Sequence, residues 1–305
     1  MTVGNFDGVH LGHAGIVREL LAAGRARGLP AVVFTFDPHP ARILRPDCAP
    51  PLLSTPDRRA ELLGELGVDA VLVQPVDAAL LALDAETFYH QILRGTGRAV
   101  LLAEGPDFRF GAGRRGDMDL LRRLAAHDAV EAITVAAVAA DGQPISSSRI
   151  RTLIAAGRVE EAAGLLTAPY RIRGQVVRGK ARGRTLGFPT ANLAGVTTLL
   201  PGPGVYGGRA RQVSPAGANG QPPQHWPAAI HIGPNVSFDE QAVSVEVHLI
   251  GFEGDLYDQQ LDVDFLARVR DTRRFDSPDA LRHQLSADIS QAALIARSSD
   301  SLGPR

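Results

Sequence analysis

The first half of the chain alternates between short apolar runs and segments with helical spacing. The runs are continuous and partly β-branched, as expected of strands that are buried on both faces. The predicted strands are 31–36, 68–73 and 99–103. The predicted helices are 14–27, 58–66, which follows the N-cap signal Thr55-Pro56, and 119–126. Strands that alternate with helices predict an α/β domain with a parallel sheet.

The pattern changes after Thr167-Ala168-Pro169, where short strands punctuated by glycine and proline replace the long helices. The predicted strands are 170–177, 205–211, 228–232, 244–250 and 260–265. Several closely spaced short strands predict a small β-barrel. Ser277-Pro278 then opens one terminal helix, expected to end near Ala292. The predicted organisation is domain 1–167, domain 168–293 and a flexible tail 294–305.

Composition narrows the range of functions. The net charge of −1 provides no overall field that would attract nucleic acid or an anionic membrane. No apolar run reaches the roughly 18 residues of a membrane-spanning helix, and we expect no secretory signal. The single cysteine, Cys48, excludes an intrachain disulfide and fits the reducing cytoplasm, where we expect the protein to act.

A dense group of polar and glycine residues lies at 4–13, directly before the first predicted helix. His10 and His13 are three residues apart and can share one face of a helical first turn. The free N–H groups and positive dipole of a helix start favour phosphate, and Gly8 and Gly12 allow the backbone to approach a ligand. On these residues alone, an incidental His-x-x-His pair or half of a metal site stays open.

A second dense group, 178–192, alternates basic residues with glycine and ends in Pro-Thr-Ala-Asn. Such a loop suits phosphate, because backbone N–H groups and side-chain charge converge on it, but it lacks the Walker A pattern. A solvated loop or an RNA-contacting loop would look similar. Low aromatic content and the absence of an RNP-like aromatic motif argue against an RNA-binding module.

Several segments, in order along the chain, resemble prokaryotic bifunctional riboflavin kinase/FMN adenylyltransferases. In the first half they are 4–13, which contains the His-x-Gly-His signature, 35–40, 104–111 with 115–117, and 145–151. In the second half they are 183–192, 204–206, 245–248, 256–257, 265–270 and Phe275. The resemblance implies a Rossmann-like nucleotidyltransferase domain followed by a Greek-key riboflavin-kinase barrel with a terminal helix. It also implies small-molecule substrates, with no nucleic acid or membrane partner, and leaves the oligomeric state open.

For the first domain, the resemblance implies transfer of AMP from ATP to FMN, which gives FAD and pyrophosphate. His10 and His13 would stabilise the ATP phosphates as catalytic residues. The other residues implied to bind ATP or phosphate are Gly4, Phe6, Asp7, Gly12, Ser147, Ser148 and Arg151. Asp107 and Phe108 are implied to bind the flavin. Ser148 stands where the family usually has threonine, which keeps the hydroxyl.

For the second domain, the resemblance implies phosphorylation of riboflavin to FMN by ATP. Glu246 would be the general base, and Thr190 and Asn192 would bind Mg²⁺ with the ATP phosphates. Arg270 is implied to contact the flavin. Gly179, Lys180 and Gly187 are expected to bind ATP phosphate, with Lys180, the chain's one lysine, as a point charge. Val236-Ser237 replaces the family's Pro-Thr.

One departure gives rise to an alternative. Only Met1-Thr2-Val3 precede Gly4, so we expect a short first strand, a poorly anchored histidine loop and weak adenylyl transfer. A riboflavin kinase without the second activity is therefore an alternative, and a non-catalytic flavin-binding protein is another.

Overall fold

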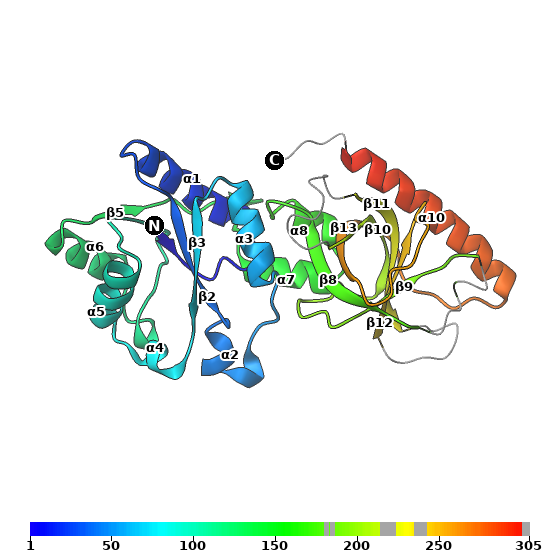
Figure 1. Ribbon diagram of the computed structural model, residues 1–305, viewed down its shortest axis with the longest axis horizontal. Helices are drawn as coiled ribbons and strands as arrows, with labels where there is room; N and C mark the ends of the chain where they lie inside the picture. Colours follow the sequence, from blue (N-terminus) through cyan, green and yellow to red (C-terminus); the bar gives the residue numbers. More distant parts are fainter. Residues whose placement is uncertain (180–182, 184–186, 214–223, 235–242, 301–305) are drawn as a thin grey trace. The chain divides into compact units, whose positions relative to one another are not determined.

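The computed structural model describes residues 1–179, 183, 187–213, 224–234 and 243–300. The chain divides into two compact units, Met1–Ser147 and Ser148–Arg305, which are drawn in Figure 1. The first unit is an α/β domain and the second is a β-barrel with a terminal helix, as the sequence predicts. The domain boundary predicted at 167/168 stays a prediction.

Parallel strands form the centre of the first unit. Strands β1 (Thr2–Val3), β2 (Val32–Asp37) and β3 (Ala70–Pro75) make one sheet in the order β1-β2-β3. Strands β4 (Leu101–Glu104) and β5 (Glu131–Thr134) form a second parallel pair. The predicted strands 31–36, 68–73 and 99–103 correspond to β2, β3 and β4. The prediction that 68–73 is buried was wrong, because β3 ends the sheet and most of its residues are exposed.

Strand β1 also lies beside β4. The Met1 nitrogen donates to the Leu101 carbonyl (2.7 Å), and the Ala103 N–H donates to the Met1 carbonyl (3.1 Å). In a parallel pair, one residue bonds to the two residues that flank its partner on the neighbouring strand, as Met1 does here with Leu101 and Ala103. The strands therefore follow the spatial order β3-β2-β1-β4-β5. In such sheets the strand order reverses next to β1, and ligands bind in the crevice at the carboxyl ends there.

Helices and short turns connect the strands of the first unit. The helices are α1 (Leu11–Arg25), α2 (Ala41–Leu44), α3 (Pro56–Glu65), α4 (Ala78–Ala82), α5 (Ala85–Phe88) and α6 (Met118–His127). Two segments are short 3₁₀ helices, η1 (Pro46–Cys48) and η3 (Ala112–Arg114), and η2 (Tyr89–Thr96) is a π-helix. Strand β6 (Ala139–Ala140) pairs with β7 (Gln143–Pro144). Thr55 caps α3 as predicted, since its hydroxyl accepts the Arg58 N–H at 3.2 Å. Buried apolar side chains from β1, β2, β4, α5, η2 and α6 form one core.

Six strands of the second unit close into a barrel in the order β10-β11-β12-β9-β8-β13. They are β8 (Tyr170–Val177), β9 (Ala191–Ala194), β10 (Gly204–Gln212), β11 (Trp226–Pro234), β12 (Val243–Leu249) and β13 (Gln260–Arg270). Helices α7 (Ser147–Ala155) and α8 (Val159–Ala163) precede the barrel. Alternate residues such as Val245 and Val247 are buried in the core, which leaves Ser244, Glu246 and His248 on the opposite face of β12.

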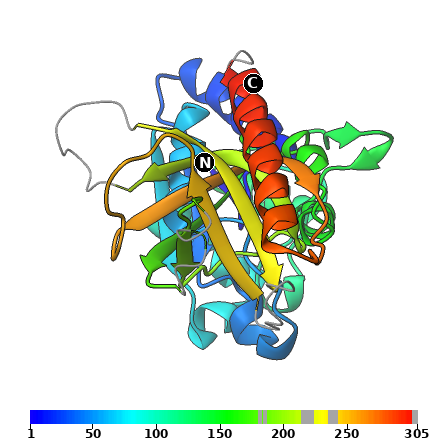
Figure 2. The same ribbon diagram turned by 90° about the vertical axis from the view of Figure 1, so that its right-hand side faces the viewer.

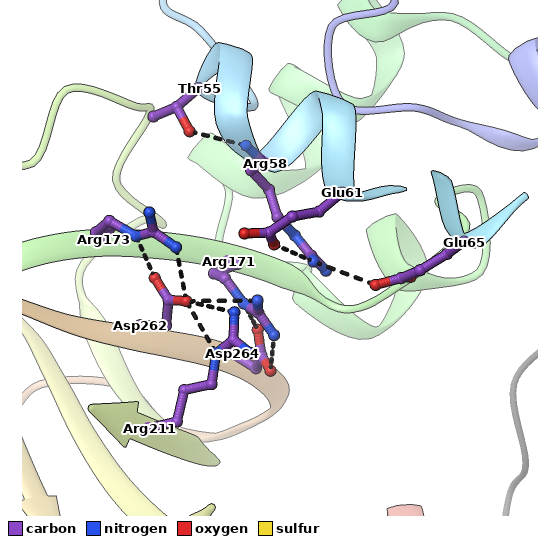
Figure 3. Close-up of polar contacts among 9 residues, drawn as sticks. All are labelled: Thr55, Arg58, Glu61, Glu65, Arg171, Arg173, Arg211, Asp262 and Asp264. Atoms are coloured by element: carbon purple, nitrogen blue, oxygen red, sulfur yellow. Dashed lines mark hydrogen bonds and ion pairs between the residues drawn. The ribbon is translucent and has the colours of Figure 1, made fainter. Parts of the chain in front are cut away.

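Arginine and aspartate side chains pair across neighbouring barrel strands (Figure 3). Asp262 is 1% exposed and accepts hydrogen bonds from Arg173 (2.6 and 2.9 Å) and Arg211 (3.0 Å). Arg171 pairs with Asp264 through two bonds of 2.6 and 2.9 Å. Burial alone would raise the pKa of Asp262, but the arginines outweigh it and lower that pKa. The pairs tie β8, β10 and β13 together.

The terminal helix α10 (Pro278–Asp300) lies along β10, β11 and β13 (Figure 2). Gly207 of β10 permits the approach, because a Cβ there would lie 2.8 Å from Ile295 Cδ1. Ser277 caps the helix, accepting the Ala280 N–H at 3.2 Å. The predicted end near Ala292 was wrong. The helix continues to Asp300 because Ala292 and Ala296, one turn apart, are both buried.

Trp226, the first residue of β11, packs edge-to-face against Phe252, with ring centroids 5.1 Å apart.

None of the helices in the described ranges is long and apolar enough to cross a membrane.

Candidate active sites

The histidine loop, residues 4–10, joins β1 to α1 at the carboxyl edge of the sheet. Its backbone turns through positive φ at Phe6 (46°), Gly8 (86°) and Val9 (42°). Non-glycine residues rarely adopt such angles, and the cost of about 1–3 kcal/mol each is accepted where the surroundings fix the chain. Phe6 and Val9 are buried, so packing holds both in place.

Asp7 fixes this loop to the backbone of residues 53–54 through its side chain. Its carboxylate is 1% exposed and accepts the backbone N–H of Leu53 (3.0 Å to each oxygen) and of Ser54 (2.9 Å). Arg59, also buried, lies 3.9 Å from it and donates to Thr35 Oγ1 on β2 at 3.0 Å. Gly4 donates its N–H to Phe34 at 3.0 Å. The expectation of a poorly anchored loop was wrong, although β1 is as short as predicted.

His10 and His13 cap the start of α1 reciprocally. His10 Nδ1 accepts the His13 N–H, and His13 Nδ1 accepts the His10 N–H, each at 3.3 Å. This is the capping-box arrangement with imidazoles in place of the usual serine and glutamate. The rings stack with centroids 3.6 Å apart and an interplanar angle of 13°. Phe6 packs against the His13 ring at 4.8 Å.

Both imidazoles favour the neutral form. Burial lowers the pKa of His10 to about 4, although Asp7 opposes the shift. Burial, His10 and Arg59 lower the pKa of His13 well below its usual value. Because each Nδ1 accepts a backbone N–H, the proton of each neutral ring resides on Nε2. The pair therefore offers two neutral N–H donors beside the helix start, which also favours negative charge.

The loop after β4 leaves the sheet at the same carboxyl edge as the histidine loop, from the neighbouring strand. Phe108, half-buried, stacks on Phe110 with centroids 5.4 Å apart, and Asp107 beside it is exposed. Both residues predicted to bind the flavin thus lie at the carboxyl edge.

Gly12 lies against His10, since a Cβ there would approach that ring to 3.0 Å.

The structure gives internal contacts to several residues that the resemblance assigned to phosphate. Gly4 completes the β1–β2 ladder, Phe6 is buried and Asp7 holds the 53–54 backbone. Ser147 donates its hydroxyl to the Asp7 carbonyl at 3.0 Å, which joins the start of α7 to the histidine loop. Ser148 and Arg151 follow on α7, and their phosphate contacts stay predictions.

In the second unit, polar residues form a row across directly opposed barrel positions. Asn192 on β9 pairs in register with Glu246 on β12, which pairs with His231 on β11. Glu246 Oε2 lies 3.4 Å from Thr190 Oγ1, and its Oε1 lies 3.4 Å from the Ser244 hydroxyl. The predicted base and the two predicted metal ligands thus meet on one face of the barrel.

The chain packs closely around this group. A Cβ on Gly179 would lie 2.2 Å from Asn192 Nδ2, so only glycine allows the backbone this close. His248 Nδ1 lies 2.7 Å from the Pro189 carbonyl and fixes the segment that carries Thr190. Gly187 has φ 90° with open space where a Cβ would be. Lys180 and the substituted Val236-Ser237 lie outside the described residues.

The Thr190 hydroxyl, the Asn192 amide oxygen and the Glu246 carboxylate together make a set of hard oxygen donors. Such donors fit Mg²⁺, which is bound through a few protein oxygens together with substrate phosphates. Clusters of three or more His, Cys, Asp or Glu side chains able to hold a metal are absent from the described ranges.

Arg270 contacts the terminal helix. Its Nε and Nη2 donate to Asp288 at 3.0 and 2.6 Å, and Asp288 is 2% exposed. The side chain therefore docks α10 on β13, and its predicted flavin contact stays a prediction.

Sequence reasoning missed several residues of both sites. They are Ser54, Arg59, Glu104, His231 and Ser244. Strand pairing could have found the last two, because alternation along β11 and β12 places them on the face of Glu246. The partners of Asp7 are far away in the sequence, and no local pattern indicates them.

Comparison with known proteins covers both units. A family model for FAD synthetase matches residues 1–149, and one for riboflavin kinase matches residues 166–296. The bifunctional riboflavin kinase/FMN adenylyltransferase of Pseudomonas fluorescens is 36% identical over 97% of this chain and 92% of its own length. That of Escherichia coli strain K12 is 36% identical over 94% of this chain and 90% of its own.

A crystal structure described as a macrolide-efflux protein from Streptococcus pneumoniae superposes with a TM-score of 0.81. It is 33% identical and covers 96% of this chain and 93% of that one. With both family models and full-length relatives matched, the chain belongs to the bifunctional riboflavin kinase/FMN adenylyltransferase family.

Proposed function

We propose that this chain makes FMN from riboflavin in its second unit and FAD from FMN in its first, with ATP as co-substrate in both. The observation that carries the proposal is the presence of two sites in one chain. The first unit has the reciprocal His10–His13 cap at the switch point of its sheet. The barrel of the second unit brings Glu246, Thr190 and Asn192 together. Family membership supports both activities in one chain.

In the first unit, an FMN phosphate oxygen attacks the α-phosphorus of ATP and pyrophosphate leaves. The Nε2–H groups of His10 and His13 donate to ATP phosphate oxygens as negative charge shifts towards the leaving group. Burial lowers the pKa of both rings, and two neutral imidazoles donate these hydrogen bonds without transferring a proton. Positioning and charge stabilisation therefore account for catalysis, as in other phosphoryl-type transfers.

In the second unit, Glu246 takes the proton of the riboflavin terminal hydroxyl as that oxygen attacks the γ-phosphorus of ATP and ADP leaves. The Thr190 and Ser244 hydroxyls lie 3.4 Å from Oε2 and Oε1 of this carboxylate, respectively. Thr190 and Asn192 would hold Mg²⁺, which when bound would neutralise charge on the transferring phosphate, while Glu246 stays available as the base. We place the protein in the cytoplasm, in keeping with its single, exposed cysteine.

Product chromatography tests the proposal. The pure protein is incubated with riboflavin, ATP and Mg²⁺, and separately with FMN, ATP and Mg²⁺. We expect FMN and FAD from the first mixture and FAD from the second. FMN alone from the first would reduce the protein to a riboflavin kinase, and tight flavin binding without product would make it a flavin-binding protein.

A further inference from the structure

Strands β1 and β4 begin as a regular parallel pair and then separate. The bonds Met1–Leu101 and Ala103–Met1 place the N–H and carbonyl of Ala103 on the side of β1. The next bond of a regular ladder would join the Val3 N–H to the Ala103 carbonyl. The Val3 N–H donates instead to Oε1 of Glu104 at 2.7 Å.

The Glu104 side chain therefore lies between the two strands at their carboxyl ends. The residue is 2% exposed, while its backbone carbonyl accepts the Val135 N–H at 2.8 Å on the β5 side. Adjacent strands normally lie about 4.8 Å apart, too close for a carboxyl group between them. The group thus acts as a spacer between β1 and β4.

The spacer lies at the point where the two substrate loops diverge. The histidine loop leaves β1 directly after Val3, and the loop with Asp107 and Phe108 leaves β4 directly after Glu104. A shift of either strand end moves the donors of one loop relative to the flavin-facing residues of the other. Burial raises the pKa of Glu104 well above its usual value, which favours a neutral acid at this position.

We propose that Glu104 is a positioning residue that holds the ends of β1 and β4 apart and so keeps the nucleotide crevice open for adenylyl transfer. The inference rests on the proposed function of the first unit. Without the spacer, the Val3 N–H pairs with the Ala103 carbonyl and the crevice narrows. Misplacement by about 1 Å can cost about 10²-fold in rate, so a clear kinetic effect follows.

The test compares three variants. Glu104→Gln keeps a neutral acceptor of the same length, Glu104→Asp is one methylene too short to reach Val3, and Glu104→Leu removes the acceptor. We expect the KM for ATP in FAD formation from FMN to rise about tenfold, or about 1.4 kcal/mol, in the Asp and Leu variants. The Gln variant keeps the native KM, and the KM for ATP in riboflavin phosphorylation, measured on the same samples, is unchanged in all three.

A merely structural role gives a different result, because a smaller folded fraction lowers the apparent kcat and leaves the KM as it was. Native KM values in Asp and Leu, or a Gln variant as impaired as Leu, would overturn the inference. If the Leu variant does not fold, the Asp variant decides. Failure of the unaltered protein to make FAD from FMN would overturn the proposed function along with it.

Discussion

A histidine pair that caps its own helix behaves differently from two exposed imidazoles. Each Nδ1 of His10 and His13 is committed to a backbone N–H, and each ring is shielded by the other. Protonation would turn the Nδ1 acceptor into a donor and break the cap. The neutral state is therefore a condition for the loop geometry as well as for the proposed catalysis.

This coupling predicts a pH dependence of stability. The pKa of His10 in the folded state is about 4, below its usual 6.5, so the unfolded chain binds the proton more tightly. The stabilisation is complete above pH 6.5 and is lost as the pH falls towards 4. From pH 7 to pH 5, His10 alone should lower the unfolding free energy of the first unit by about 2 kcal/mol.

Hydrogen exchange in peptides from α1, at the two pH values in denaturant, measures this change. His10→Asn is the matched control, because asparagine is a good N-cap that does not titrate. It should show a shallower pH dependence than the unaltered protein. Equal slopes in the two proteins would contradict the prediction.

At the scale of one helix, glycine at position 12 leaves room for the His10 ring. Gly12→Ala should raise helix propensity by up to about 1 kcal/mol, yet the new Cβ would lie 3.0 Å from His10 and displace it. We expect FAD formation to fall about tenfold or more with little loss of stability. Gly64→Ala in α3, where a Cβ meets nothing within 4 Å, is the control. It should stabilise without changing either activity, and an equally active Gly12→Ala protein would contradict this reading.

For the terminal helix, the prediction concerns stability and not activity. Asp288 is buried and accepts three hydrogen bonds from Nε and Nη2 of Arg270 and one from Gln284 (2.7 Å). Asp288→Asn leaves the Arg270 charge without its partner, and breaking such a buried pair costs about 3–5 kcal/mol. Thermal unfolding followed by circular dichroism should show the loss, whereas Asp279→Asn at the exposed helix start should be near neutral. Equal stability of the two variants would contradict the docking role of Arg270.

Helices and strands could be predicted where the pattern of apolar residues is regular. Parts of the candidate active sites could be predicted where their residues are close together in the sequence. β8 was predicted residue for residue, and β2, β4, β10 and β12 to within a few positions. Among the strands missed, β5 and β9 are four residues long and pair with distant partners, while β6 and β7 are only two residues each. The His10–His13 pair was visible as a motif. Its reciprocal cap, the Asp7–Arg59 contact and the Glu104 spacer depend on long-range packing that no local pattern encodes.

On the scale of the whole molecule, each proposed reaction has its own unit and its own chemistry. Glu246→Gln keeps the size of the side chain and removes the base, so riboflavin phosphorylation should fall about 10²–10⁴-fold. FAD formation from added FMN should stay native, because His10 and His13 belong to the other unit. Parallel assays with riboflavin and with FMN measure both rates on one sample. Equal loss of both would show that the reactions are not separable in this way.

The position of Trp226 determines what optical experiments on this protein can see. It is the chain's one tryptophan and lies in β11 against Phe252, so tryptophan fluorescence, excited at wavelengths that tyrosine does not absorb, originates from the barrel alone. Flavins absorb in the range where tryptophan emits, and flavin bound to the barrel should therefore quench that emission by energy transfer. A denaturation curve recorded by tryptophan fluorescence follows the kinase unit, while unfolding of the adenylyltransferase unit leaves that signal unchanged.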